Sequence, residues 1–164
     1  MAEAKITTDH DEIRRWVEAR GGHPARVKGT NDQGSSGVAM GRLAEQRAAD
    51  PSVKEFGQRM ITDHSRAGAE LKTIAANKNI QLPADVDSSE KSTMDRLSKL
   101  SGAEFDKEYM SEMVNDHEAD AKEFQTQANE GNDADIKRFA AKTLPLIQEH
   151  LQMARGIAKK VEAK

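Results

Sequence analysis

Three long segments of this chain repeat apolar residues at steps of three and four, and this spacing restricts the fold more than any other feature. It is the spacing of one face of an α-helix, because one turn takes 3.6 residues. The sequence therefore predicts helices over about 51–78, 102–129 and 133–161. Their inward-facing residues would be Val53, Phe56, Met60, His64, Ala67, Leu71 and Ile74; Phe105, Tyr109, Met113, His117, Ala121, Phe124 and Ala128; and Ile136, Ala140, Thr143, Ile147, His150, Ala154, Ile157 and Val161.

Residues that begin and end helices separate these segments. Asp50-Pro51 predicts a helix N-cap followed by proline at the first helical position, where the missing N–H costs nothing. Ser101-Gly-Ala-Glu104 has the pattern of a capping box, and Gly131-Asn-Asp133 predicts a break followed by a new N-cap. A shorter helix over about 36–49 would precede the first long one.

The composition favours the same all-α fold. Apolar residues make up 36% of the chain, aromatic residues 4% and charged residues 32%. This mixture suits amphipathic helices with solvated faces better than strands, which prefer β-branched and aromatic residues. Two short connections, with one long crossover between the second and third helices, predict a ferritin-like four-helix bundle. The crossover would contain a short helix with Met94, Leu97 and Leu100.

The first 30 residues are expected to form a small unit of their own. Thr8 or Asp9 can cap a short helix that runs to about Arg20, where Gly21-Gly22 ends it. The next residues, 31–37 (NDQGSSG), have the composition of a flexible linker. We therefore expect a helical appendage at 1–30, a linker at 31–37 and a bundle domain at 38–164.

Several classes of function receive no support from the sequence. A net charge of −3 argues against nucleic acid as a partner, and the lack of cysteine excludes disulfides and thiolate ligands. No apolar run is long enough for an export signal or a membrane span, so we expect a cytoplasmic protein without a membrane partner. Neither a phosphate-binding glycine loop nor a nucleophile–base pair is evident. These features favour a protein without enzymatic activity, which acts as a homo-oligomer or through a protein partner.

Three histidines lie in the apolar stripes of three different predicted helices. His64, His117 and His150 each fall within about one turn of the helix centre, about 5 Å at 1.5 Å per residue, so they can meet in one layer. Imidazole is a common ligand of transition-metal ions near neutral pH. One interpretation is therefore a metal site made by these histidines. Each of these histidines follows an acidic residue that would contact the metal-bound rings and not the ion itself. These residues are Asp63, Asp116 and Glu149.

The other interpretation of these histidines is structural. Adjacent residues point about 100° apart on a helix, so the acid beside each histidine is not its co-ligand. It would lie at the edge of an interface and accept a hydrogen bond from a neighbouring helix. The Glu-x-x-His pair of di-iron bundles is also absent, because Ile61, Val114 and Ile147 stand three residues before the histidines. Histidine–acid hydrogen bonds would then fix the register of the helices.

Several motifs in fixed order resemble a bacterial ferritin-like family catalogued as domain of unknown function 4142. They are Val53–His64 (VKEFGQRMITDH), Leu82-Pro83, Leu100–Asp106 (LSGAEFD) with Tyr109-Met110, Asp116-His117-Glu118, and Phe139–Pro145 (FAAKTLP) with His150-Leu151. The resemblance covers about Val38 to the C-terminus. It implies a ferritin-like bundle and no particular activity, because the family has no established function.

Two features depart from what is usual in that family. Members often carry a glutamate in the first helix, in a Gly-Met-Ala-Glu run, where this chain has Gly37-Val-Ala-Met40. A first-helix ligand is therefore missing. Many members also begin with an export or lipoprotein signal, which is not evident here. The segments 6–16 and 20–30 are similar to a short module of small uncharacterised bacterial proteins, which suggests a docking role.

Two hypotheses for the function follow. The first is a non-enzymatic bundle with a stress-related or assembly role, which acts through self-association or partner binding. The alternative is a metal-binding or redox bundle that uses the interior histidines, with a transition-metal ion as cofactor.

Overall fold

The computed structural model describes residues 36–79 and 88–164, and helices account for nearly all of them. These helices are α2 (Ser36–Arg47), α3 (Pro51–Asn77), α4 (Ser88–Ser98), α5 (Gly102–Glu130) and α6 (Ala134–Glu162). The described part of the chain contains no β-strand, so the all-α prediction is confirmed. The expected N-terminal helix lies outside the described residues. Helix α2 corresponds to the helix that the sequence predicts over about 36–49.

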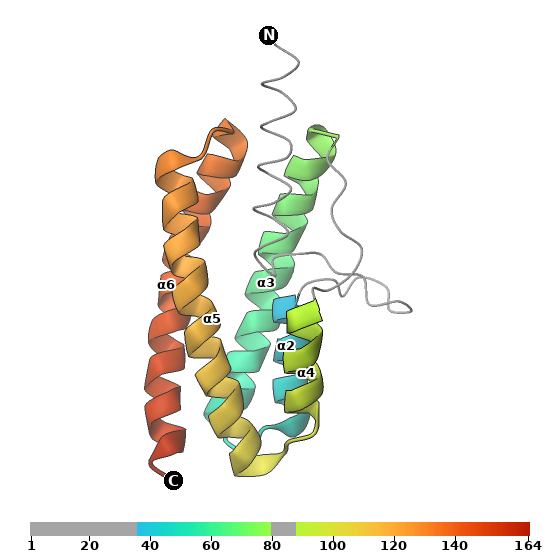
Figure 1. Ribbon diagram of the computed structural model, residues 1–164, viewed down its shortest axis with the longest axis vertical. Helices are drawn as coiled ribbons and strands as arrows, with labels where there is room; N and C mark the ends of the chain where they lie inside the picture. Colours follow the sequence, from blue (N-terminus) through green and yellow to red (C-terminus); the bar gives the residue numbers. More distant parts are fainter. Residues whose placement is uncertain (1–35, 80–87) are drawn as a thin grey trace.

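The three long helices and the two shorter ones of the described residues pack together as a bundle (Figure 1). Helices α5 and α6 lie side by side and antiparallel, while α2 packs antiparallel along the first half of α3. Helix α3 also contacts α6, and the short α4 lies beside α2 and the beginning of α5. Residues 48–50 and 131–133 are short connections, whereas the long connection from α3 to α5 contains α4. None of the described helices has the length and apolar character needed to cross a membrane.

The predicted caps at Asp50 and Asp133 are confirmed. The Asp50 carboxylate accepts a hydrogen bond from the backbone N–H of Ser52 at 2.8 Å, and Pro51 is the first residue of α3. The Asp133 carboxylate accepts from the N–H groups of Asp135 and Ile136 at 2.9 and 3.0 Å. Each cap satisfies backbone donors that have no partner inside the helix. The boundaries of α2, α3, α5 and α6 differ from the predicted ones by no more than about two residues.

The predicted capping box at Ser101 is wrong, because the Ser101 side chain makes no capping hydrogen bond. The capping box assumes a helical first residue, whereas Gly102 has a φ of 64°. A buried carboxylate ties this end of the bundle together instead. Asp106 accepts hydrogen bonds from the N–H groups of Ala49 and Asp50 at 3.1 and 2.9 Å, which joins α5 to the turn between α2 and α3.

Two apolar clusters fill the bundle at different heights. The basal cluster lies among all five helices and comprises Met40, Leu43, Ala44, Ala48, Val53, Phe56, Met60, Leu97, Phe105, Tyr109, Met110, Met113, Ala154 and Val161. The distal cluster lies among α3, α5 and α6 and comprises Leu71, Ala75, Phe124, Ile136, Phe139, Ala140, Leu144 and Ile147. Along each long helix, one histidine separates the two clusters.

Candidate metal centre

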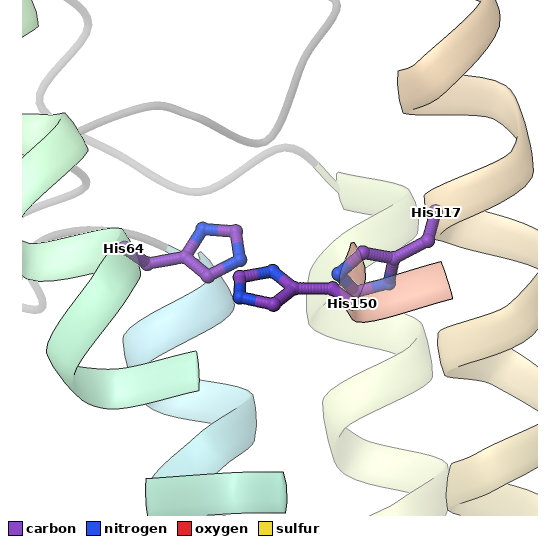
Figure 2. Close-up of side chains that lie close together, drawn as sticks. All are labelled: His64, His117 and His150. Atoms are coloured by element: carbon purple, nitrogen blue, oxygen red, sulfur yellow. The ribbon is translucent and has the colours of Figure 1, made fainter. Parts of the chain in front are cut away.

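The side chains of the three histidines on the long helices lie close together (Figure 2). Along each helix, the histidine stands between residues of the basal cluster and residues of the distal cluster. His64 comes from α3, His117 from α5 and His150 from α6, and their rings point toward one another. The ring centroids of His117 and His150 are 5.6 Å apart. The His64 centroid lies 6.2 Å from that of His117 and 6.1 Å from that of His150. One ring nitrogen from each residue lies within 4.8 Å of the other two. His117 and His150 are buried, and His64 is partly buried.

A hydrogen bond to the backbone determines which nitrogen of His117 carries the hydrogen and which keeps its lone pair. Its Nδ1 atom lies 2.7 Å from the carbonyl oxygen of Met113, one turn earlier in α5. A carbonyl oxygen can only accept, so Nδ1 carries the hydrogen and Nε2 keeps the lone pair of the neutral ring. The Nε2 atom is buried and has no hydrogen-bond partner.

A carboxylate orients His150 in the same manner. Its Nε2 atom lies 2.7 Å from Oδ2 of Asp63 on α3. Burial acts to raise the pKa of Asp63, but hydrogen bonds from His150 and Arg59 outweigh it and lower that pKa below the ordinary value. Asp63 is therefore ionised near neutral pH, so Nε2 donates and Nδ1 keeps the lone pair. Nδ1 is also buried without a hydrogen-bond partner.

Asp63 belongs to a short chain of charged side chains at the edge of the cluster. Arg59 donates from Nε to Asp63 at 3.0 Å and from Nη2 to Glu149 at 2.7 Å. Asp63 thus contacts a ring directly, and Glu149 is connected to it through Arg59. Asp116, the third acid singled out from the sequence, is exposed on α5. Sequence reasoning missed Arg59, although its position four residues before Asp63 is a recognised helical ion-pair spacing.

The environment keeps the three rings neutral at pH 7. Burial, followed by repulsion from the other two rings, lowers the pKa of His64 to about 3. Burial lowers the pKa of His117 to about 4, although its hydrogen bond to Met113 opposes the change. Burial also lowers the pKa of His150 below its ordinary value, against the effect of Asp63. A neutral imidazole is the form that binds a metal ion.

Two buried ring nitrogens of this cluster have no hydrogen-bond partner, and this lowers the stability of the folded protein. Leaving one buried polar atom unsatisfied costs about 1–3 kcal/mol. Here His117 Nε2 and His150 Nδ1 both belong to the same cluster of rings, while the opposite nitrogen of each ring is firmly hydrogen-bonded. Metal-binding histidines commonly donate their second ring N–H to a carboxylate or a backbone carbonyl, as these two do.

Comparison with known proteins identifies the family of this chain. The family model described as "Domain of unknown function (DUF4142)" matches residues 20–157. No curated protein and no solved structure matches the chain. The match includes all three histidines, and it begins inside the segment 1–30 that we expected to be a separate unit. Because the matched residues are most of the sequence, this chain belongs to the DUF4142 family.

Proposed function

We propose that this protein is a metal-binding bundle in which His64, His117 and His150 hold one divalent transition-metal ion. The observation that carries the proposal is the pair of buried, unpartnered nitrogens on His117 and His150, each on a ring whose other nitrogen is hydrogen-bonded. A cation between the rings would satisfy both lone pairs at once. His64 supplies the third nitrogen.

The proposal includes a ferritin-like arrangement of the bundle. Helices α2, α3, α5 and α6 would be its four helices, with α4 inside the crossover. The short connections at 48–50 and 131–133 and the long connection between α3 and α5 support this assignment. The ligand set differs from that of di-iron bundles, which use four glutamates and two histidines. Three imidazoles suit a single ion rather than a pair.

The ligand chemistry narrows the choice of metal. Imidazole suits zinc, copper, iron and nickel, whereas magnesium and calcium prefer oxygen ligands. Three nitrogens around a tetrahedral ion, each about 2.05 Å from it, are about 3.3 Å apart. The three ligand nitrogens, which lie within 4.8 Å of one another, would therefore have to move closer together on binding an ion. Three protein ligands leave a fourth position for water or another small ligand.

The direct test is metal uptake by the full chain, purified without chelator and titrated with Zn²⁺ and with Co²⁺ as a coloured substitute. We expect one ion per chain and a rise in Tm that grows with metal concentration, since a ligand of the folded state stabilises it by mass action. The double variant His117→Gln/His150→Gln should lose both. As a matched control, His10→Gln/His23→Gln removes the other two histidines of the chain and should bind as the wild type does.

The opposite result would favour a structural role for the histidines. A wild-type protein that takes up neither ion, or a double variant that binds as well as the wild type, would overturn the proposal. The histidine–carboxylate contact would then serve to fix helix register. The function would be sought in self-association or in a protein partner.

A further inference from the structure

We infer that Gly37 is a positioning residue for the metal centre, because it holds the His64 ring in place by direct contact. This inference rests on the proposed function and concerns His64, whose ring makes no hydrogen bond within residues 36–79 and 88–164. Gly37 lies in the first turn of α2, immediately before a residue, Val38, that is buried. In Figure 2, α2 passes behind the His64 side chain.

The contact between Gly37 and His64 leaves no room for a side chain. A Cβ atom on Gly37 would lie 2.5 Å from both Cγ and Nδ1 of His64, and 2.8 Å from its Cε1. These separations are well below those of non-bonded carbon atoms in contact. Alanine at this position would therefore displace the imidazole ring or push α2 away from α3. Glycine weakens a helix relative to alanine, so its presence in this turn is explained by the contact.

The three ligands are held in different ways. His117 is fixed by a carbonyl oxygen and His150 by a carboxylate. In residues 36–79 and 88–164, His64 has ring contacts with these two histidines and the contact with Gly37, but no hydrogen bond. Steric contact with α2 thus takes the place of the hydrogen bond that orients the other rings.

A second glycine contact lies one turn further along α2 and allows the two helices to lie close together. A Cβ on Gly41 would lie 2.5 Å from the carbonyl oxygen of Gly57, and a Cβ on Gly57 would lie 2.7 Å from that of Gly41. The two backbones are therefore in close contact at this point. This close approach of the two backbones accompanies the contact of Gly37 with the His64 ring.

The test compares Co²⁺ binding by the full-length wild type with that of Gly37→Ala, well below the Tm of either protein. We expect Gly37→Ala to weaken the affinity by about tenfold or more, the range seen when the support of a metal ligand is lost. The visible spectrum of bound Co²⁺ should also change. Gly68→Ala and Gly156→Ala are matched controls, because a Cβ at either position meets nothing within 4 Å. Both should bind as the wild type does.

A double variant separates positioning from general packing. In a His64→Ala background, Gly37→Ala should have no further effect on affinity, because the residue through which it acts is gone.

The outcomes distinguish the inference from the proposed function. If the wild type binds no Co²⁺, the metal site itself is wrong, and this inference falls with it. If the wild type binds and Gly37→Ala binds equally well with the same spectrum, only the inference is overturned. A further loss of affinity from Gly37→Ala in the His64→Ala background would also overturn it.

Discussion

The two halves of the bundle, on either side of the histidines, are stabilised differently. Five helices enclose the basal cluster, and it contains most of the largest fully buried side chains, including Tyr109, Phe56 and Phe105. Only three helices enclose the distal cluster in the described part of the chain, and only Ile136 among those largest side chains belongs to it. Apolar burial therefore contributes more to the basal half.

The distal half of the bundle contains several ion pairs and a surface pocket. Lys78 pairs with Asp133 at 2.7 Å and with Asp135 at 3.0 Å, and Lys142 pairs with Glu70 at 3.1 Å, each joining α3 to α6. A pocket of about 360 Å³ opens between the same two helices. The histidine cluster thus lies at the level where α2 begins, between the basal cluster and a distal cluster that only α3, α5 and α6 enclose among the described residues.

The largest effect is expected from truncating the basal core. Phe56 is fully buried, and its ring centroid lies 6.0 Å from that of His117. Phe56→Ala should lower the free energy of unfolding by about 3–5 kcal/mol in urea denaturation, because it leaves a cavity. It should also weaken Zn²⁺ binding, since His117 loses a supporting contact.

Ile136→Ala is the matched change in the distal core. It should cost about 2–5 kcal/mol, the range for an aliphatic truncation, and leave Zn²⁺ affinity near that of the wild type. Equal weakening of metal binding by both variants would show that the two halves do not differ in how they support the histidines.

Acid should destabilise the histidine layer before it affects the carboxylates. The folded-state pKa values of His64 and His117, about 3 and about 4, lie below the unfolded value near 6.5. The unfolded chain therefore takes up protons first as the pH falls. Each of the two histidines should cost about 2 kcal/mol of stability between pH 7 and pH 5 in the metal-free protein.

This pH dependence can be measured by urea denaturation at pH 7, 6 and 5. Its sign is fixed: the stabilisation is fully present above pH 6.5 and decreases as the pH falls toward the folded pKa values. Replacing one of the two rings in His117→Gln should reduce the decrease by about 2 kcal/mol. Stability that stays constant from pH 7 to pH 5 would mean that the pKa values of the two rings are the same in the folded and unfolded states, which would contradict the prediction.

A smaller effect is expected at the basal end, where Asp106 joins α5 to the turn between α2 and α3. Asp106→Ala would leave the N–H groups of Ala49 and Asp50 without their acceptor. The cost should be about 1–3 kcal/mol in the same denaturation assay. Asp106→Asn retains one acceptor oxygen and should lose less. A loss of stability no greater than for an exposed carboxylate would contradict this role.

The smallest effect is expected for the exposed ion pair of the distal half. Lys142 is 72% exposed and Glu70 is 37% exposed. Lys142→Ala should change the free energy of unfolding by less than about 1 kcal/mol, because water and salt screen such pairs. A larger loss that disappears at high salt would show that ion pairing contributes more to the distal half than its exposure suggests.

Local features of the sequence were sufficient to predict the helices and their faces. The apolar spacing and the caps at Asp50 and Asp133 act within one helix, so they can be read without tertiary information. The level of the three histidines also follows from sequence, because each stands near the middle of a long helix. That much of the candidate site was predictable. The metal itself, and the ferritin-like arrangement, stay predictions.

Contacts between distant residues decided the rest. The partner of Asp63 on another helix, His150, lies 87 residues away, and the two backbone donors held by Asp106 lie 57 and 56 residues away. No local pattern reports which buried nitrogen is left without a partner, or that Gly37 lies against His64. The sequence alone determined where helices form and which face of each is apolar, because these depend on neighbours within a few residues. Only the tertiary structure decided which nitrogens meet and what orients them, because helix packing sets those distances.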